Sequence, residues 1–124
     1  MSVLELTELS AGYAGVPAAR GISLKVDSAE VVALLGPNGA GKTTTLLTAA
    51  GVLPIIQGDV DFEGRSIRGL RIHQVARRGL SLVPEDRASE GLCLALSVRD
   101  NISLGNLRSV SSASLISSRR ERKR

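Results

Sequence analysis

The segment Gly36-Pro37-Asn38-Gly39-Ala40-Gly41-Lys42-Thr43 matches the pattern G-x-x-x-x-G-K-[ST] at every fixed position. The apolar run 30–35 before it predicts a fully buried strand. Residues 42–50 after it predict a helix that Gly51 ends. A glycine-rich turn between a buried strand and a helix indicates an α/β fold with a phosphate-binding loop at its centre.

The residue types of this loop suit the binding of phosphate groups. Its glycines let the backbone turn tightly and bring N–H groups close to an anion, and the helix N-terminus adds partial positive charge. The Lys42 ammonium is suited to the terminal phosphates, and the Thr43 hydroxyl is suited to ligate Mg²⁺. The alternative is a turn that binds nothing. The expected nucleotide contacts are Gly36, Pro37, Asn38, Gly39, Ala40, Gly41, Lys42, Thr43 and Thr44.

Length and composition are those of one globular domain. The chain has 124 residues, of which 43% are apolar and 23% charged. The sequence shows no run of 18 apolar residues and no signal-like start, so we expect a cytosolic protein without a membrane span. A single cysteine, Cys93, excludes an internal disulfide framework, and we expect it to be a small buried residue.

The net charge of +4 does not indicate a nucleic-acid-binding protein. Residues 119–124 contain five basic side chains and one acidic one, so they carry the whole net charge, and residues 1–118 are neutral. A terminal run of charge is usually a solvated end, and RNA or anionic lipid is the less favoured partner. We therefore expect no nucleic-acid partner.

The remaining elements follow from the pattern of apolar residues. Residues 3–9, 22–26 and 58–64 alternate and predict half-exposed strands, with a turn over 11–15 and a loop over 52–57. Residues 71–78 predict a helix that ends at Gly79. Residues 80–83 predict a short strand that Pro84 ends.

Three further side chains are candidates for a chemical role. Tyr13, expected in a loop, can stack on a nucleotide base or fill the edge of the sheet. Glu85 follows a predicted strand, where ligands bind in open α/β sheets, so it can sense or ligate Mg²⁺ or be an ordinary surface charge. His73 has no suitably spaced second ligand, so we expect it to face solvent.

These motifs together resemble the N-terminal half of an ABC-type ATP-binding cassette. Tyr13 matches the base-stacking aromatic loop, residues 36–44 match Walker A, and 82–85 occupy the Q-loop position. Gly58-Asp59-Val60 matches the segment after the helix. Residues 97–101 are similar to the segment that opens the helical subdomain. The resemblance implies a P-loop NTPase core with an antiparallel β part, in which Glu85 acts in catalysis and, with Thr43, at the metal.

Finer similarities concern the transported solute. Residues 10–13 and 34–47 look most like the ATP-binding subunit of branched-chain amino-acid importers. Residues 84–87, followed by Glu90-Gly91-Leu92, also resemble sugar-importer cassettes. In both groups glutamate can replace the usual glutamine of the Q-loop. The resemblance therefore implies an importer, most similar to those for branched-chain amino acids.

The family resemblance covers about residues 3–107, which we expect to form the N-terminal part of the nucleotide-binding domain. Residues 108–124 are expected to begin the helical subdomain or to be a disordered basic tail, and from Val110 a marginal helix or disorder is expected. No Leu-Ser-Gly-Gly-Gln signature, Asp-Glu strand end or switch histidine follows residue 107. We expect the chain to hold MgATP but not to hydrolyse it alone.

The resemblance also implies partners and a location. Such cassettes pair with a second cassette and with membrane permease subunits, at the inner face of the plasma membrane. Two other interpretations remain open. The chain can be a truncated, non-catalytic nucleotide-binding module, with apolar strand faces left uncovered. It can also be a P-loop kinase for a small molecule, because the Walker A motif alone does not distinguish a kinase from a transport cassette.

Overall fold

The computed structural model describes residues 1–104, 111–112 and 115–116. The chain divides into two compact units, Met1–Leu82 and Val83–Arg124.

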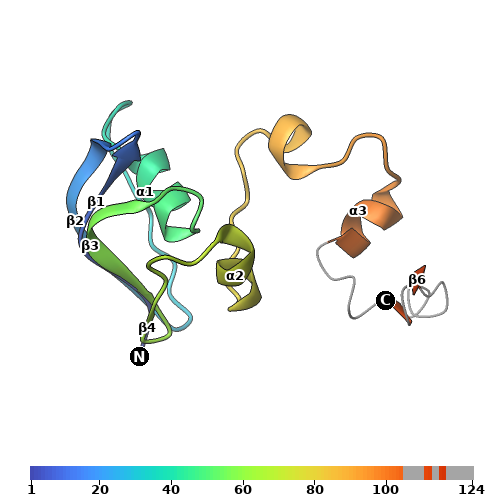
Figure 1. Cartoon of the computed structure of the whole chain (residues 1–124), viewed down its shortest axis with the longest axis horizontal. Helices are drawn as coiled ribbons and strands as arrows, with labels where there is room; N and C mark the ends of the chain where they lie inside the picture. The colour runs from blue at the N-terminus through green and yellow to red at the C-terminus, as the bar shows by residue number, and fades with distance from the viewer. Residues whose placement is uncertain (105–110, 113–114, 117–124) are drawn as a thin grey trace. The chain divides into compact units, whose positions relative to one another are not determined.

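The first unit begins with a long β-hairpin (Figure 1). Strand β1 (Ser2–Tyr13) pairs antiparallel with β2 (Val16–Asp27). Both residues of the connecting turn, Ala14 and Gly15, have positive φ, of 49° and 79°. A two-residue turn with positive φ at both positions matches the twist of the flanking strands. The strands predicted over 3–9 and 22–26 are therefore confirmed, and both are longer than predicted.

Two more strands complete an antiparallel sheet with the order β2-β1-β3-β4. Strand β3 (Ile55–Phe62) pairs with β1, and β4 (Arg65–Ser66) pairs with β3. The strand predicted over 58–64 is confirmed, but 55–57 belong to it as well, and not to a loop. This sheet is the antiparallel part of the α/β fold, as predicted.

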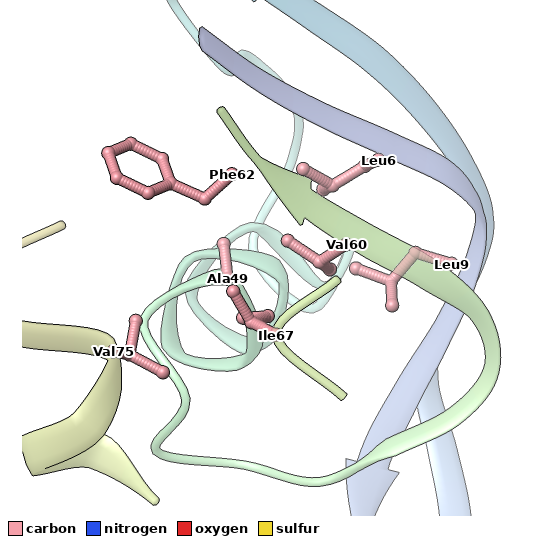
Figure 2. Close-up of a cluster of buried hydrophobic side chains, with 7 residues drawn as sticks. All are labelled: Leu6, Leu9, Ala49, Val60, Phe62, Ile67 and Val75. Carbon is pink, nitrogen blue, oxygen red and sulfur yellow. The ribbon is translucent and has the colours of Figure 1, made fainter. Parts of the chain in front are cut away.

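Two helices join the sheet in the first unit. Helix α1 (Lys42–Ala49) is the helix predicted after the glycine-rich loop, and Gly51 just beyond it has a φ of 78°. Helix α2 (Ile72–Arg77) is the second predicted helix. Figure 2 shows that side chains of the sheet, of both helices and of the segment after β4 form one hydrophobic cluster. Its members are Leu6, Leu9, Ala49, Val60, Phe62, Ile67 and Val75, each at most 7% exposed.

The buried strand predicted over 30–35 is wrong. Residues 30–36 have no regular structure, and Val31 and Leu35 are 95% and 87% exposed. The strand predicted over 80–83 is likewise not formed. A parallel strand is stable only when neighbouring strands pair with it and helices cover both faces. In the described part of the chain, neither segment pairs with another strand, so apolar composition alone does not make it one.

The second unit contains a π-helical turn, η1 (Arg87–Gly91), and helix α3 (Val98–Leu104). Ser97 caps α3: its Oγ accepts a hydrogen bond from the Asp100 N–H (3.1 Å) and donates one to Asp100 Oδ2 (2.7 Å). Strands β5 (Ser111–Ser112) and β6 (Leu115–Ile116) pair antiparallel, so these four residues are not helical. Most of 108–124 lies outside the described residues, so the expected boundary at 107 stays a prediction.

Two predictions about single residues have different outcomes. His73 is exposed, as expected. Cys93 is also exposed, so the prediction of a buried cysteine is wrong. Its neighbours Leu92 and Leu94 are 51% and 71% exposed, so this apolar segment is not covered within the described part of its unit. No helix among the described residues is long and apolar enough to cross a membrane.

Candidate functional site

The glycine-rich loop has the backbone conformation that its glycines predict. Gly39 and Gly41 have φ of 83° and 86°, in the left-handed region that side chains disfavour. Within the loop, the Ala40 N–H donates to Pro37 O at 3.2 Å. Gly41 directly precedes α1, so the loop delivers the chain into the N-terminus of a helix.

Lys42 folds back over this loop. Its Nζ donates hydrogen bonds to Gly36 O and Pro37 O, both at 2.7 Å. An ammonium has three donors, so these two bonds leave capacity for a phosphate oxygen. The side chain thus holds a positive charge at the loop before any anion arrives.

The first turn of α1 adds further donors. The first N–H groups of a helix have no partner inside it and point out of its N-terminus. In α1 the Thr45 N–H is bonded to Gly41 O at 2.8 Å, so the groups before it are available. No acidic residue stands in the first turn to neutralise this end. This end of α1 therefore combines positive charge with N–H donors, which fit a chain of phosphates.

The three consecutive threonines differ in burial. Thr43 is exposed, whereas Thr44 and Thr45 are 5% and 2% exposed. The Thr45 hydroxyl donates to Gly41 O at 2.8 Å. The exposed Thr43 hydroxyl fits a metal ion that also binds phosphate oxygens. Among residues 1–104, 111–112 and 115–116, no three His, Cys, Asp or Glu side chains are grouped so that they could hold a metal ion.

Tyr13 lies at the end of β1 and not in a loop. It pairs with Val16 across the hairpin turn, and it is 53% exposed. The same hairpin touches the phosphate loop, because Ala18 and Ala19 of β2 lie against Gly41. The ring is thus accessible on an element that contacts the loop.

Glu85 belongs to the second unit, so the structure describes it separately from Lys42 and Thr43. Its side chain is exposed. The structure brings the loop residues 36–44 together and places Tyr13 on the adjoining hairpin. It does not describe any geometry that joins Glu85 to them.

The residue after Glu85 has a structural role that the sequence reasoning missed. Asp86 caps η1: its carboxylate accepts hydrogen bonds from the Ser89 hydroxyl (2.7 Å) and from the N–H groups of Ala88 (3.0 Å) and Ser89 (3.3 Å). The Ser89 hydroxyl, followed by these N–H groups, lowers the pKa of Asp86 below its ordinary value. An aspartate just before a short polar segment is the signal for such a turn.

Comparison with known proteins identifies relatives of this arrangement. A family model described as "ABC transporter" matches residues 19–123. The chain is 40% identical over 103 residues to the ribose import ATP-binding protein RbsA of Corynebacterium glutamicum, covering 83% of this chain and 20% of that protein. It is 36% identical over 110 residues to the lipopolysaccharide export system ATP-binding protein LptB of Escherichia coli K12, covering 83% and 46%. The chain thus spans less than half the length of either relative.

Solved structures of ATP-binding cassettes also resemble this chain. A nucleotide-free ATP-binding cassette from an ABC transporter matches 64% of this chain with a TM-score of 0.59 and 28% identity, over 31% of its own length. The protein cbiO1 from Clostridium perfringens, part of the ABC transporter complex cbiONQ, matches 60% of this chain with a TM-score of 0.55 and 31% identity, also over 31% of its length. The fold described above is therefore that of the corresponding part of such cassettes.

Proposed function

Because this chain belongs to the ABC transporter family of ATP-binding cassettes, we propose that its loop at residues 36–44 binds MgATP for a transport system. The observation that carries the proposal is the position of Lys42, whose Nζ is held by Gly36 O and Pro37 O at the N-terminus of α1. A fixed ammonium and free helix N–H groups favour a polyphosphate over a neutral ligand.

Each remaining residue has a proposed contact. Thr43 ligates the magnesium ion through its exposed hydroxyl, and Tyr13 stacks on the adenine base. Glu85 contacts the ion, directly or through water, and senses the nucleotide state. When bound, Mg²⁺ neutralises charge on the phosphate oxygens.

The partners that we propose for this chain are those with which ABC transporter cassettes work. The cassette pairs with a second cassette and acts on membrane permease subunits, at the inner face of the plasma membrane. Nucleotide binding can drive such a partner only if the protein contacts it differently with and without nucleotide. The charged loop from Glu85 and the exposed surface from Gly91 to Asn101 are the proposed coupling surface.

The first test is nucleotide affinity. Lys42→Ala in the full chain is expected to weaken ATP binding by about 10- to 100-fold, because charge-assisted hydrogen bonds to the phosphates are lost. The affinity is measured by titration with a fluorescent ATP analogue in Mg²⁺. Lys25→Ala is the matched control, because Lys25 is a half-exposed lysine on β2 that pairs with Asp27 at 3.9 Å. Equal affinity of the wild-type and Lys42→Ala chains would contradict the proposal.

The solute proposed is a branched-chain amino acid, on the likeness of residues 10–13 and 34–47 to those importers. A sugar is the second candidate, and the similarity to the ribose import protein RbsA favours it. Lys42→Ala introduced into the chromosomal gene separates the two. Loss of uptake of radiolabelled leucine with normal uptake of ribose supports the first, and the reverse result supports the second.

A different class of function is a nucleotide-binding module that drives no transport. The exposure of Val31 (95%) and Leu35 (87%) bears on this alternative, because uncovered apolar segments promote association. Sedimentation of the purified chain as a monomer with cooperative thermal unfolding would favour an independent module. Concentration-dependent association would favour a part of a larger assembly.

A further inference from the structure

Gly41 lies directly against strand β2, although 21 residues of sequence separate it from Ala19. A Cβ placed on Gly41 would be 2.7 Å from Ala18 O and 2.9 Å from Ala19 Cβ. Non-bonded carbon atoms reach their optimal separation only at about 3.5–4.0 Å. Gly41, the residue directly before α1, therefore has no spare room on the side that faces β2.

The wall formed by β2 is itself enclosed. Ala19 is 2% exposed, and it pairs with Ala11 of β1, which is fully buried. The Ala19 side chain lies on the side of Gly41 where an added Cβ has no room, so a larger side chain at this buried position competes with Gly41 for the same space. Alanine is thus the largest residue that this contact accommodates without a shift of the loop.

Hydrogen bonds from helix α1 also hold Gly41 in place. Its carbonyl accepts hydrogen bonds from both the Thr45 N–H and the Thr45 hydroxyl, each at 2.8 Å. Gly41 is therefore fixed between β2 and the first turn of α1. Since Lys42 follows directly, any displacement of Gly41 moves the ammonium and the helix N–H groups with it.

We propose that Ala19 is a positioning residue for the phosphate-binding loop, and that its small size sets how well the N-terminus of α1 is aligned on the nucleotide phosphates. This inference rests on the proposed function and adds to it a residue that touches neither nucleotide nor metal. Binding groups lose much of their strength when their supporting contacts move them by a fraction of an ångström.

The test is Ala19→Val in the full chain, with Ala18→Val as matched control. Ala18 is exposed and has no partner at the register shift between β1 and β2, whereas Ala19 is 2% exposed, so the control adds the same two methyl groups at a surface position of the same strand. Ala19→Val is expected to weaken binding of MgATP and of inorganic tripolyphosphate by about tenfold, and Ala18→Val by less than about twofold. Ala18→Val should retain the wild-type melting temperature, whereas Ala19→Val is expected to stay folded with a melting temperature lowered by several degrees, because it overpacks a buried site.

Amide NMR shifts separate positioning from a general structural role. Ala19→Val should displace the signals of Gly41 and Lys42, while the signals of α2 stay in place. If Ala19→Val does not fold, Ala19→Ser decides, because it adds a single atom. A roughly threefold loss of tripolyphosphate affinity with unchanged melting would support the proposal, and unchanged affinity would overturn it.

The outcomes also distinguish this inference from the proposed function. A wild-type chain that binds neither ATP nor tripolyphosphate refutes the proposed function, and the role of Ala19 with it. A wild-type chain that binds both, together with a folded Ala19→Val chain of equal affinity, refutes only the role of Ala19.

Discussion

Lys42 and Thr43 are adjacent, yet their surroundings differ. Lys42 is partly buried and bonded to two loop carbonyls, whereas the Thr43 hydroxyl is at the surface. If the proposed function holds, the lysine is expected to contact the phosphates whether or not a metal is present. Thr43 is expected to contribute only when a cation accompanies the phosphates, because its proposed role is that of a neutral oxygen ligand to the metal.

Thr43→Ala tests this division at the residue scale. With Mg²⁺ present, the variant is expected to bind ATP about tenfold more weakly than wild type, and with excess EDTA to differ by less than about twofold. Thr43→Ser keeps the hydroxyl and should behave as wild type. Titrations of wild type, Thr43→Ala and Thr43→Ser with the fluorescent analogue in both buffers give the six affinities. An equal loss with and without Mg²⁺ would assign Thr43 to the phosphates or to the helix instead.

Among the elements, η1 depends on one carboxylate. Asp86 accepts three hydrogen bonds from Ala88 and Ser89, and these bonds favour its ionised form. Its pKa in the folded chain is therefore below the ordinary value. A lowered carboxyl pKa contributes stability above the ordinary pKa of about 4, and this contribution is lost as the pH falls through the lowered value.

The lowered pKa of Asp86 predicts how η1 responds to pH. The amide signals of Ala88 and Ser89 are expected to shift toward unstructured positions as the pH falls below about 4, with a midpoint lower than that of an ordinary aspartate. Asp86→Asn should abolish this transition, and Asp86→Ala should loosen the turn at neutral pH. Glu90→Gln, a change of another exposed carboxylate in η1, is the control. A midpoint at or above the ordinary value would contradict the role of the three bonds.

For the first unit as a whole, stability depends on the hydrophobic cluster of Figure 2. Leu9 is fully buried in it. Leu9→Ala is expected to lower the free energy of unfolding by about 2–5 kcal/mol, because it removes buried methyl groups and leaves a cavity. Leu35→Ala, at a side chain of the same unit that is 87% exposed, should change it by less than about 0.5 kcal/mol. Urea unfolding followed by circular dichroism measures both values, and similar effects of the two changes would contradict the assignment of the core.

Catalysis is also a property of the whole molecule. Phosphoryl transfer needs positioned groups around the γ-phosphate, and no Leu-Ser-Gly-Gly-Gln signature follows residue 107 in this sequence. The 124-residue chain is therefore expected to bind MgATP and to release phosphate no faster than its Lys42→Ala variant. Phosphate release by both chains is compared at saturating ATP. ATP turnover that depends on Lys42 would contradict this expectation, because the groups of the 124-residue chain would then suffice for hydrolysis.

The exposed segment 30–35 shows where reasoning from sequence failed. The glycine-rich loop, α1 and the segments 3–9 and 22–26 of strands β1 and β2 were predictable, because each depends on nearby residues: glycines that accept positive φ, a helix-forming run, and alternation of apolar side chains. For 30–35, the same reasoning took apolar character as burial. Apolar composition indicates that a segment is stable when covered, but it does not supply the strands that pair with it.

Local sequence was therefore enough for the phosphate-binding loop, for the helix behind it and for the family to which the chain belongs. Tertiary structure alone decided that 30–35 and Cys93 are exposed, that Tyr13 ends a strand, and that Gly41 lies against Ala19. The reason is physical. Backbone conformation responds to a few neighbouring residues, whereas burial and close contact join residues that are distant in the chain and become adjacent only on folding.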